Sequence, residues 1–263
     1  MYKYTILFLA FLVGCSSAPE TGRSQFIVMS HAQEMKLGQE AFTKILKEEK
    51  TITKGTQYDT MQRVGKKVAL AAERLYPELV HGYQWKFALI KDKDMVNAWA
   101  LPGGKCGVYT GLLPITENED ALAIVMAHEV AHVIARHGAE RSSQAMASSV
   151  IAGIAMSEMN SVDQAIVLGA YGIGLALPFS RTQETEADQI GLYIAADAGF
   201  DPREAIPLWN RMAKSPGKGP PPEFMSTHPS PETRIKKIRG WMPRAMMYYD
   251  TAMAHESALK QLK

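Results

Sequence analysis

Residues 116–141 have the sequence TENEDALAIVMAHEVAHVIARHGAER, and this stretch decides the fold of the chain. Its first four residues match a capping box, in which Ser or Thr is followed three residues later by Glu or Gln. An apolar run continues from there to about Arg141. We therefore predict a largely buried helix that begins at Thr116.

Residues 128–132 of this helix are HEVAH, which has the pattern HExxH. Because residues four apart share one helix face, His128 and His132 can offer imidazole nitrogens to one metal ion. Glu129 lies about 100° round the helix, from where it reaches a metal-bound water without ligating the metal. The alternative is a pair of core histidines on a buried helix. A buried Glu without a partner is costly, and this favours the metal site.

Residues 180–188 supply a second pattern, SRTQETEAD. Its first four residues are another capping box, which predicts a helix to about Ala198. Glu184 and Asp188 share a face of that helix. Glu184 can complete a site of two His and one Glu, and Asp188 can accept the second N–H of a ligand His. The alternative is a solvated acidic face, which we would favour if the HExxH pattern were absent.

Four motifs in order resemble the M48 zinc metallopeptidases, a gluzincin family, over about residues 30–240. They are NAWALPGG at 97–104, HEVAH at 128–132, ETEAD at 184–188, and THPS at 227–230 followed by Arg234-Ile235. The resemblance implies an α+β zincin-like fold, mostly helical, with a small β-sheet beside the HExxH helix. It also implies one Zn²⁺ per chain, bound by His128, His132 and Glu184, with Glu129 as the general base for peptide hydrolysis.

The strand Asn97, Ala98, Trp99 and Ala100 is the expected substrate dock, because in related zincins the peptide pairs with a sheet edge beside the cleft. A plain β-hairpin is the simpler interpretation, and both can hold. More broadly, we predict helices over 32–50, 58–76 and from Pro231 to the end. The predicted strands span 83–90, 95–100 and 105–110, with a turn at 101–104.

His228 follows a Pro-rich loop at 215–222 and precedes Pro229. Three roles are open: oxyanion stabilisation, occupation of the fourth zinc position in a closed state, or a hydrogen bond that only holds the loop. With the loop it would form a lid over the metal. Arg234 is another candidate for the cleft, but its position one turn from a loop is weak evidence. The cluster of Arg234, Lys236, Lys237 and Arg239 is most simply a solvated helix face. His137 is expected to end the HExxH helix in a structural role.

The N-terminus resembles a bacterial lipoprotein signal: Lys3, an apolar run at 4–13, and Leu-Val-Gly-Cys at 12–15. An ordinary secretory signal is the alternative. The prediction is a signal peptide at 1–14, a lipid anchor on Cys15 with a tether at 15–29, and a peptidase domain at 30–263. Ser16 after the Cys suggests the outer membrane, facing the periplasm. The apolar residues 142–177 predict packed helices, because polar residues interrupt them before the ~20 that a membrane span needs.

The 263 residues, with a net charge of +2 and two Cys, exclude a disulfide-rich scaffold and do not favour a nucleic-acid binder. The predicted function is a zinc endopeptidase for misfolded or envelope proteins in the periplasm. Its partners would be unfolded polypeptides, the membrane through Cys15, and outer-membrane assembly machinery. The alternative is a non-proteolytic, zinc-stabilised chaperone or assembly factor. A zinc hydrolase of non-peptide amides is a third reading, disfavoured by the edge strand.

Overall fold

The structure, a computed structural model, describes residues 15–156, 179–214, 224, 228 and 231–261. At its centre is a four-stranded sheet in the order β3-β4-β6-β5. The strands are β3 (Thr51–Ile52), β4 (Lys86–Ile90), β5 (Ala98–Leu101) and β6 (Lys105–Tyr109). β4 and β6 run parallel, whereas the β3–β4 and β5–β6 pairs are antiparallel. β5 is therefore an edge strand, and the three longer strands lie within the predicted segments give or take one residue.

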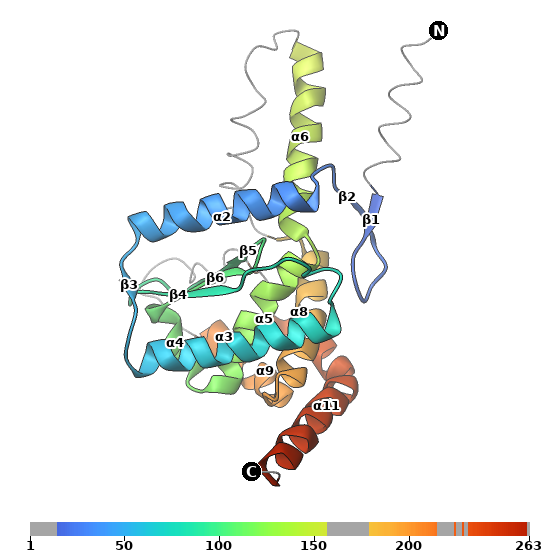
Figure 1. Cartoon of the computed structure of the whole chain (residues 1–263). Helices are drawn as coiled ribbons and strands as arrows, with labels where there is room; N and C mark the ends of the chain where they lie inside the picture. Colours follow the sequence, from blue (N-terminus) through green and yellow to red (C-terminus); the bar gives the residue numbers. More distant parts are fainter. Residues whose placement is uncertain (1–14, 157–178, 215–223, 225–227, 229–230, 262–263) are drawn as a thin grey trace.

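Helices cover both faces of this sheet because its side chains alternate between two apolar surfaces. α2 (His31–Glu48) lies along one face, where Phe42 packs with Ile90 and Trp99. α3 (Thr56–Leu75) and α5 (Glu119–Ile134) cover the other face, which carries Leu89 and Val108 (Figure 1). This arrangement confirms the predicted fold class, a mostly helical α+β structure with a small sheet beside the HExxH helix.

α5 begins later than predicted. Thr116 is the last residue of the short helix α4 (Leu113–Thr116), which follows the 3₁₀ turn η1 (Thr110–Leu112). Its hydroxyl donates to the Leu113 carbonyl instead of capping α5. Glu117 then has a φ of 62°, a left-handed conformation that breaks the helical path. Asn118 is the N-cap, and its side chain accepts from the Ala121 N–H, so the capping box at 116–119 was wrong by two residues.

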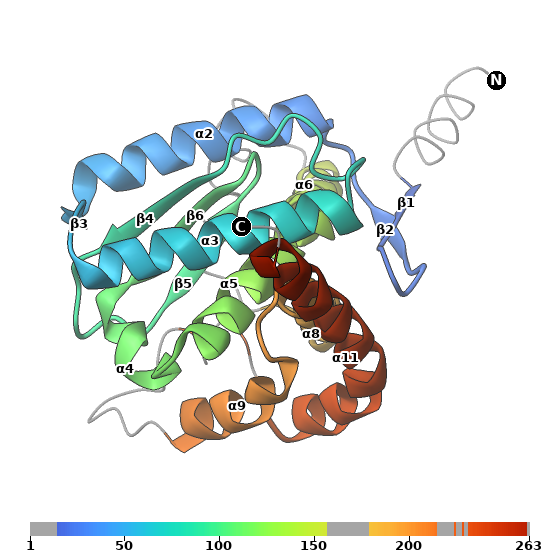
Figure 2. The same cartoon turned by 60° about the horizontal axis from the view of Figure 1, so that its bottom comes forward.

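The C-terminal half packs helices onto α5. The predicted capping box at Ser180 is confirmed and opens α8 (Arg181–Asp197). The turn η2 (Pro202–Glu204), α9 (Ala205–Lys214) and α11 (Pro231–Gln261) follow, and Figure 2 shows α9 and α11 on the side of α8 and α5 away from the sheet. α6 (His137–Met156) continues the chain beyond α5. The predicted helices within 157–178 and the Pro-rich loop at 215–222 lie outside the described residues.

The segment expected to be a tether is packed against the domain. β1 (Cys15–Ser17) and β2 (Ser24–Phe26) form an antiparallel hairpin. Ile27 and Met29 are buried against Ala139 of α6. The tether prediction was therefore wrong for this segment. Its polar composition suggested exposure to solvent, but polar side chains such as Arg23 and Gln25 form hydrogen bonds with groups of the domain. The predicted signal at 1–14 lies outside the described residues, and acylation of Cys15 stays a prediction.

Within the described ranges, no helix is both long and apolar enough to cross a membrane.

Candidate active site

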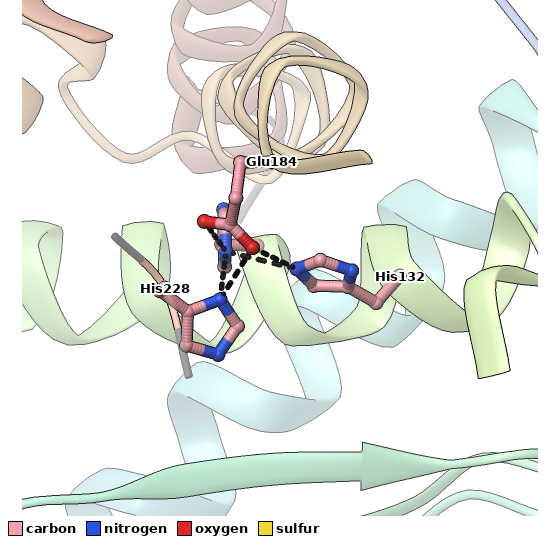
Figure 3. Close-up of side chains that lie close together, drawn as sticks. His132, Glu184 and His228 are labelled. Atoms are coloured by element: carbon pink, nitrogen blue, oxygen red, sulfur yellow. Dashed lines mark hydrogen bonds and ion pairs between the residues drawn. The ribbon is translucent and has the colours of Figure 1, made fainter. Parts of the chain in front are cut away.

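Four side chains from three parts of the chain meet between α5 and α8. His128 and His132 come from α5, Glu184 from the first turn of α8, and His228 from the segment before α11. Figure 3 shows His132, Glu184 and His228 pointing towards one another. One ligand atom of each of the four lies within 4.8 Å of the others.

The short distances between the nitrogen and oxygen atoms of these four side chains show that they point to a common centre. The Nε2 atoms of His128 and His132 are 3.1 Å apart. Glu184 Oε1 lies 3.3 Å from His132 Nε2 and 2.7 Å from His228 Nδ1. His228 Nδ1 is in turn 3.2 Å from His128 Nε2. The spacing of HExxH on one helix thus places both histidines as predicted, and the fold adds Glu184 and His228.

The residues fit a zinc ion. All four are at most 4% exposed, and the Oε2 atom of Glu184 is buried without a hydrogen bond, although Arg234 Nη1 lies 3.1 Å away. Burial lowers the pKa of His128 and of His132, so both rings are neutral at pH 7 and keep a lone pair for a metal. Imidazole nitrogens and a carboxylate oxygen are the ligands that Zn²⁺ prefers.

Glu129 lies at the edge of this cluster with an unused carboxylate oxygen. Its Oε1 atom is buried without a hydrogen bond, 3.5 Å from His228 Nε2. Burial raises the pKa of Glu129 to about 7. A carboxylate with a pKa near neutrality can both accept and release a proton at working pH, which is what a general base needs.

Asp188 and Arg234 hold the far side of His128. Asp188 Oδ1 is 3.1 Å from His128 Nδ1, the contact that the sequence predicted for this carboxylate. Arg234 donates from Nε and Nη2 to Asp188 at 2.8 and 2.6 Å, and its guanidinium stacks on the Trp209 ring. Arg234 is only 4% exposed, so its interpretation as part of a solvated face was wrong. In the sequence, nothing distinguishes Arg234 from the charged residues near it, Lys236, Lys237 and Arg239.

His132 is held on its other side by two groups from outside α5. The Phe179 ring stacks on its imidazole with centroids 3.7 Å apart. His132 Nδ1 lies 2.9 Å from His137 Nδ1. His137 does not end the HExxH helix, because Arg136 adopts a φ of 53° and His137 begins α6. In the sequence, only the short separation of five residues between His132 and His137 pointed to this contact.

A cavity of about 250 Å³ runs from the cluster along the edge strand. The predicted substrate dock, Asn97, Ala98, Trp99 and Ala100, lines it together with Glu129, His132 and His228. Tyr109 N–H donates to the Asn97 carbonyl, and in an antiparallel ladder the pairing groups alternate. The backbone groups of Ala98 and Ala100 therefore point away from β6, towards the open edge; the Ala98 N–H is met there by the Asn97 side chain.

Comparisons with known proteins agree with this geometry. The family model described as Peptidase family M48 matches residues 56–242. The "Mitochondrial metalloendopeptidase OMA1" of Schizosaccharomyces pombe is 35% identical over 93% of this chain and 72% of its own length. The protein of the same name from Saccharomyces cerevisiae is 33% identical over 89% of this chain and 70% of its own. The "Beta-barrel assembly-enhancing protease" of Escherichia coli is 27% identical over 88% of this chain and 48% of its own.

These relatives correct the predicted location. The two that match at 35% and 33% identity are named as mitochondrial proteins and cover 93% and 89% of this chain, whereas a bacterial relative at 34% identity covers only 58% of it. The predicted location in a bacterial outer membrane, facing the periplasm, was therefore wrong. A short apolar run that ends in small residues is an address for export. It imposes no constraint on the packing of the helices that follow it, so the predicted fold class is confirmed although the predicted location is wrong.

Proposed function

This chain belongs to peptidase family M48 and is a zinc metalloendopeptidase, and we propose that it cleaves unfolded or misfolded polypeptide segments with Glu129 as the general base. The observation that carries the proposal is the position of Glu129. Glu129 lines the same cavity as His132, His228 and the strand edge, and one of its carboxylate oxygens makes no hydrogen bond.

We assign His128, His132 and Glu184 as the zinc ligands. Bound there, zinc supplies Lewis-acid chemistry that polarises the scissile carbonyl and acidifies water. Glu129 accepts a proton from the attacking water and passes it to the leaving amine nitrogen. Asp188 accepts the second N–H of His128 and so fixes its ring, while Arg234 holds the Asp188 carboxylate.

The substrate class follows from the edge of β5. A peptide that adds to this edge forms backbone hydrogen bonds with Ala98 and Ala100, and such bonds make little demand on side-chain sequence. Only an extended chain can present its backbone in this way. Folded proteins keep their backbone groups paired, so unfolded or misfolded segments are the substrates that this edge accepts.

His228 occupies the remaining side of the cluster. Catalytic zinc sites keep one position open for water or substrate, whereas His228 Nδ1 lies within 3.2 Å of both His128 Nε2 and Glu184 Oε1. We propose that the structure corresponds to a closed state in which His228 is the fourth ligand. It must move aside before a substrate carbonyl can approach.

The experiment that tests this proposal compares the purified protein with Glu129→Gln. We expect about one zinc per chain in both proteins, and a loss of casein cleavage of roughly 10²–10⁴-fold in the variant. Glu119→Gln is the matched control, because Glu119 lies in the first turn of the same helix, outside the cavity. Equal cleavage by wild type and Glu129→Gln would refute the assignment of the base. Zinc without any cleavage by the wild type would instead favour the non-proteolytic alternative.

A further inference from the structure

A chain of buried polar groups leads from His132 away from the metal cluster. Beyond the contact between the Nδ1 atoms of His132 and His137, His137 Nε2 lies 2.9 Å from Glu186 Oε2. Neither His137 nor Glu186 is exposed to solvent. Glu186 is two residues from Glu184 on α8, so it points away from the metal and into this second network.

The outer end of this network belongs to the N-terminal hairpin. Arg23 donates from Nε to Glu186 Oε1 at 2.9 Å and from Nη2 to Glu186 Oε2 at 3.0 Å. The Thr21 hydroxyl also donates to Glu186, at 2.7 Å. Arg23 is clamped on its other side by Glu140 of α6, at 2.6 Å. Arg23 lies outside residues 56–242, the range of the family match.

The hydrogen-bond chemistry of this network allows one arrangement that suits a metal. The Glu186 carboxylate, paired with Arg23, is an acceptor, so His137 donates from Nε2. A neutral His137 then has an unprotonated Nδ1, which accepts the hydrogen on Nδ1 of His132. That leaves Nε2 of His132 with a lone pair directed into the cluster. If His137 donated at Nδ1 instead, a neutral His132 would carry its hydrogen on Nε2 and could not ligate there.

We infer that His137 and Glu186 are positioning residues that hold His132 in the tautomer presenting Nε2 to zinc, and that Arg23 of the N-terminal hairpin keeps Glu186 in place. The inference rests on the proposed zinc site. It gives the hairpin a role at a site to which it contributes no ligand. The two carboxylates of residues 184–188 that are not ligands then have separate roles. Asp188 orients His128 directly, and Glu186 orients His132 through His137.

The first test replaces His137 in two ways and measures zinc affinity by competition with a chromophoric chelator. His137→Leu removes the acceptor for His132, and we expect zinc affinity to fall roughly 10–100-fold, the range typical for such outer partners. His137→Asn keeps an acceptor near the position of Nδ1, and we expect it to recover most of the affinity. Wild-type affinity in a folded His137→Leu variant, or no difference between Leu and Asn, would overturn the inference.

The second test compares two residues of the loop that connects β1 and β2. Arg23→Gln breaks the links to Glu186 and Glu140, whereas Glu20→Gln weakens the contacts of the same hairpin with Tyr76 and Arg244, which are not part of this network. Both variants loosen the hairpin, but we expect only Arg23→Gln to weaken zinc binding, by several-fold. Equal losses in the two variants would show a general structural effect and contradict the role of Arg23.

Long-range ¹H–¹⁵N NMR spectra of the wild-type zinc form decide the case if the His137 variants do not fold. We expect His132 to carry its hydrogen on Nδ1 and His137 on Nε2; the opposite assignment refutes the network. A wild-type protein that binds zinc but does not cleave would refute the proposed peptidase activity while leaving these readouts intact. A wild-type protein that binds no zinc would refute both.

Discussion

Gly191 of α8 lies directly against the backbone of His128 on α5. A Cβ atom added to Gly191 would be 2.8 Å from both the Cα and the N atom of His128. The absence of a side chain at this one position lets the two helices approach. This approach brings Glu184, on the same helix as Gly191, to the two histidines of α5.

Gly191→Ala should therefore separate α8 from α5. The clash is with backbone, which cannot rotate away, so we expect a loss of about 2 kcal/mol in the free energy of unfolding and weaker zinc binding. Urea unfolding and chelator competition measure the two effects. Gly240→Ala is the control, because a Cβ there meets nothing within 4 Å and alanine favours the helix. A Gly191→Ala variant with unchanged zinc affinity would show that this contact does not set the position of Glu184.

His228→Ala should change zinc binding and cleavage in opposite directions. Removing the fourth side chain from the cluster lowers zinc affinity. At saturating zinc the coordination position is already open, so we expect the rate of casein cleavage to rise. Chelator competition and initial rates measure the two quantities. A fall in the rate at saturating zinc would assign His228 to stabilising the oxyanion, and no change in either would remove it from the site.

Ala100→Pro should weaken substrate binding without disturbing the metal. The N–H of Ala100 points towards the open edge of β5, so proline there removes a group that pairs with substrate and leaves the β5–β6 ladder intact. We expect a higher KM for an unfolded substrate and unchanged zinc affinity. Trp99→Pro is the contrasting variant: Trp99 pairs with Gly107 of β6, so its replacement should destabilise the sheet itself. Unchanged KM in a folded Ala100→Pro variant would contradict strand pairing.

Glu140→Gln should flatten the dependence of stability on acid pH. Burial raises the pKa of Glu140, but hydrogen bonds from Arg23, Gln183 and Gln25 outweigh it and hold the pKa below its ordinary value. A carboxylate with a depressed pKa in the folded state contributes stability above its unfolded pKa, near 4.5, and loses it as the pH falls below that value. At pH 7 the variant should lose about 2 kcal/mol, the scale of hydrogen bonds to a charged group.

The comparison is made on metal-free protein, so that acid release of zinc does not contribute. Urea unfolding at pH 7 and at pH 3 gives the stability of each protein. The difference between wild type and Glu140→Gln should shrink at the lower pH. Equal differences at the two values would mean that Glu140 does not titrate between them.

Much of the fold follows from local patterns in the sequence. α2 and α3 were predicted within two residues at each end, because the spacing of apolar residues reports directly on a helix face. The cap at Ser180 was predicted because a capping box is contained in four residues. The start of α5 was missed for a nonlocal reason, since Thr116 ends a separate short helix before Asn118 can cap the next.

The sequence by itself determined the pair His128 and His132, because two residues four apart on one helix must share a face. The pattern of the second capped helix made Glu184 a candidate third ligand, and the family resemblance supported it. Only the tertiary structure decided that His228 joins them, that Arg234 is buried on Asp188, and that Arg23 reaches Glu186 across 163 residues of sequence. These contacts depend on how helices and loops distant in the chain pack together. A polar residue shows the same local pattern whether it faces water or a buried partner.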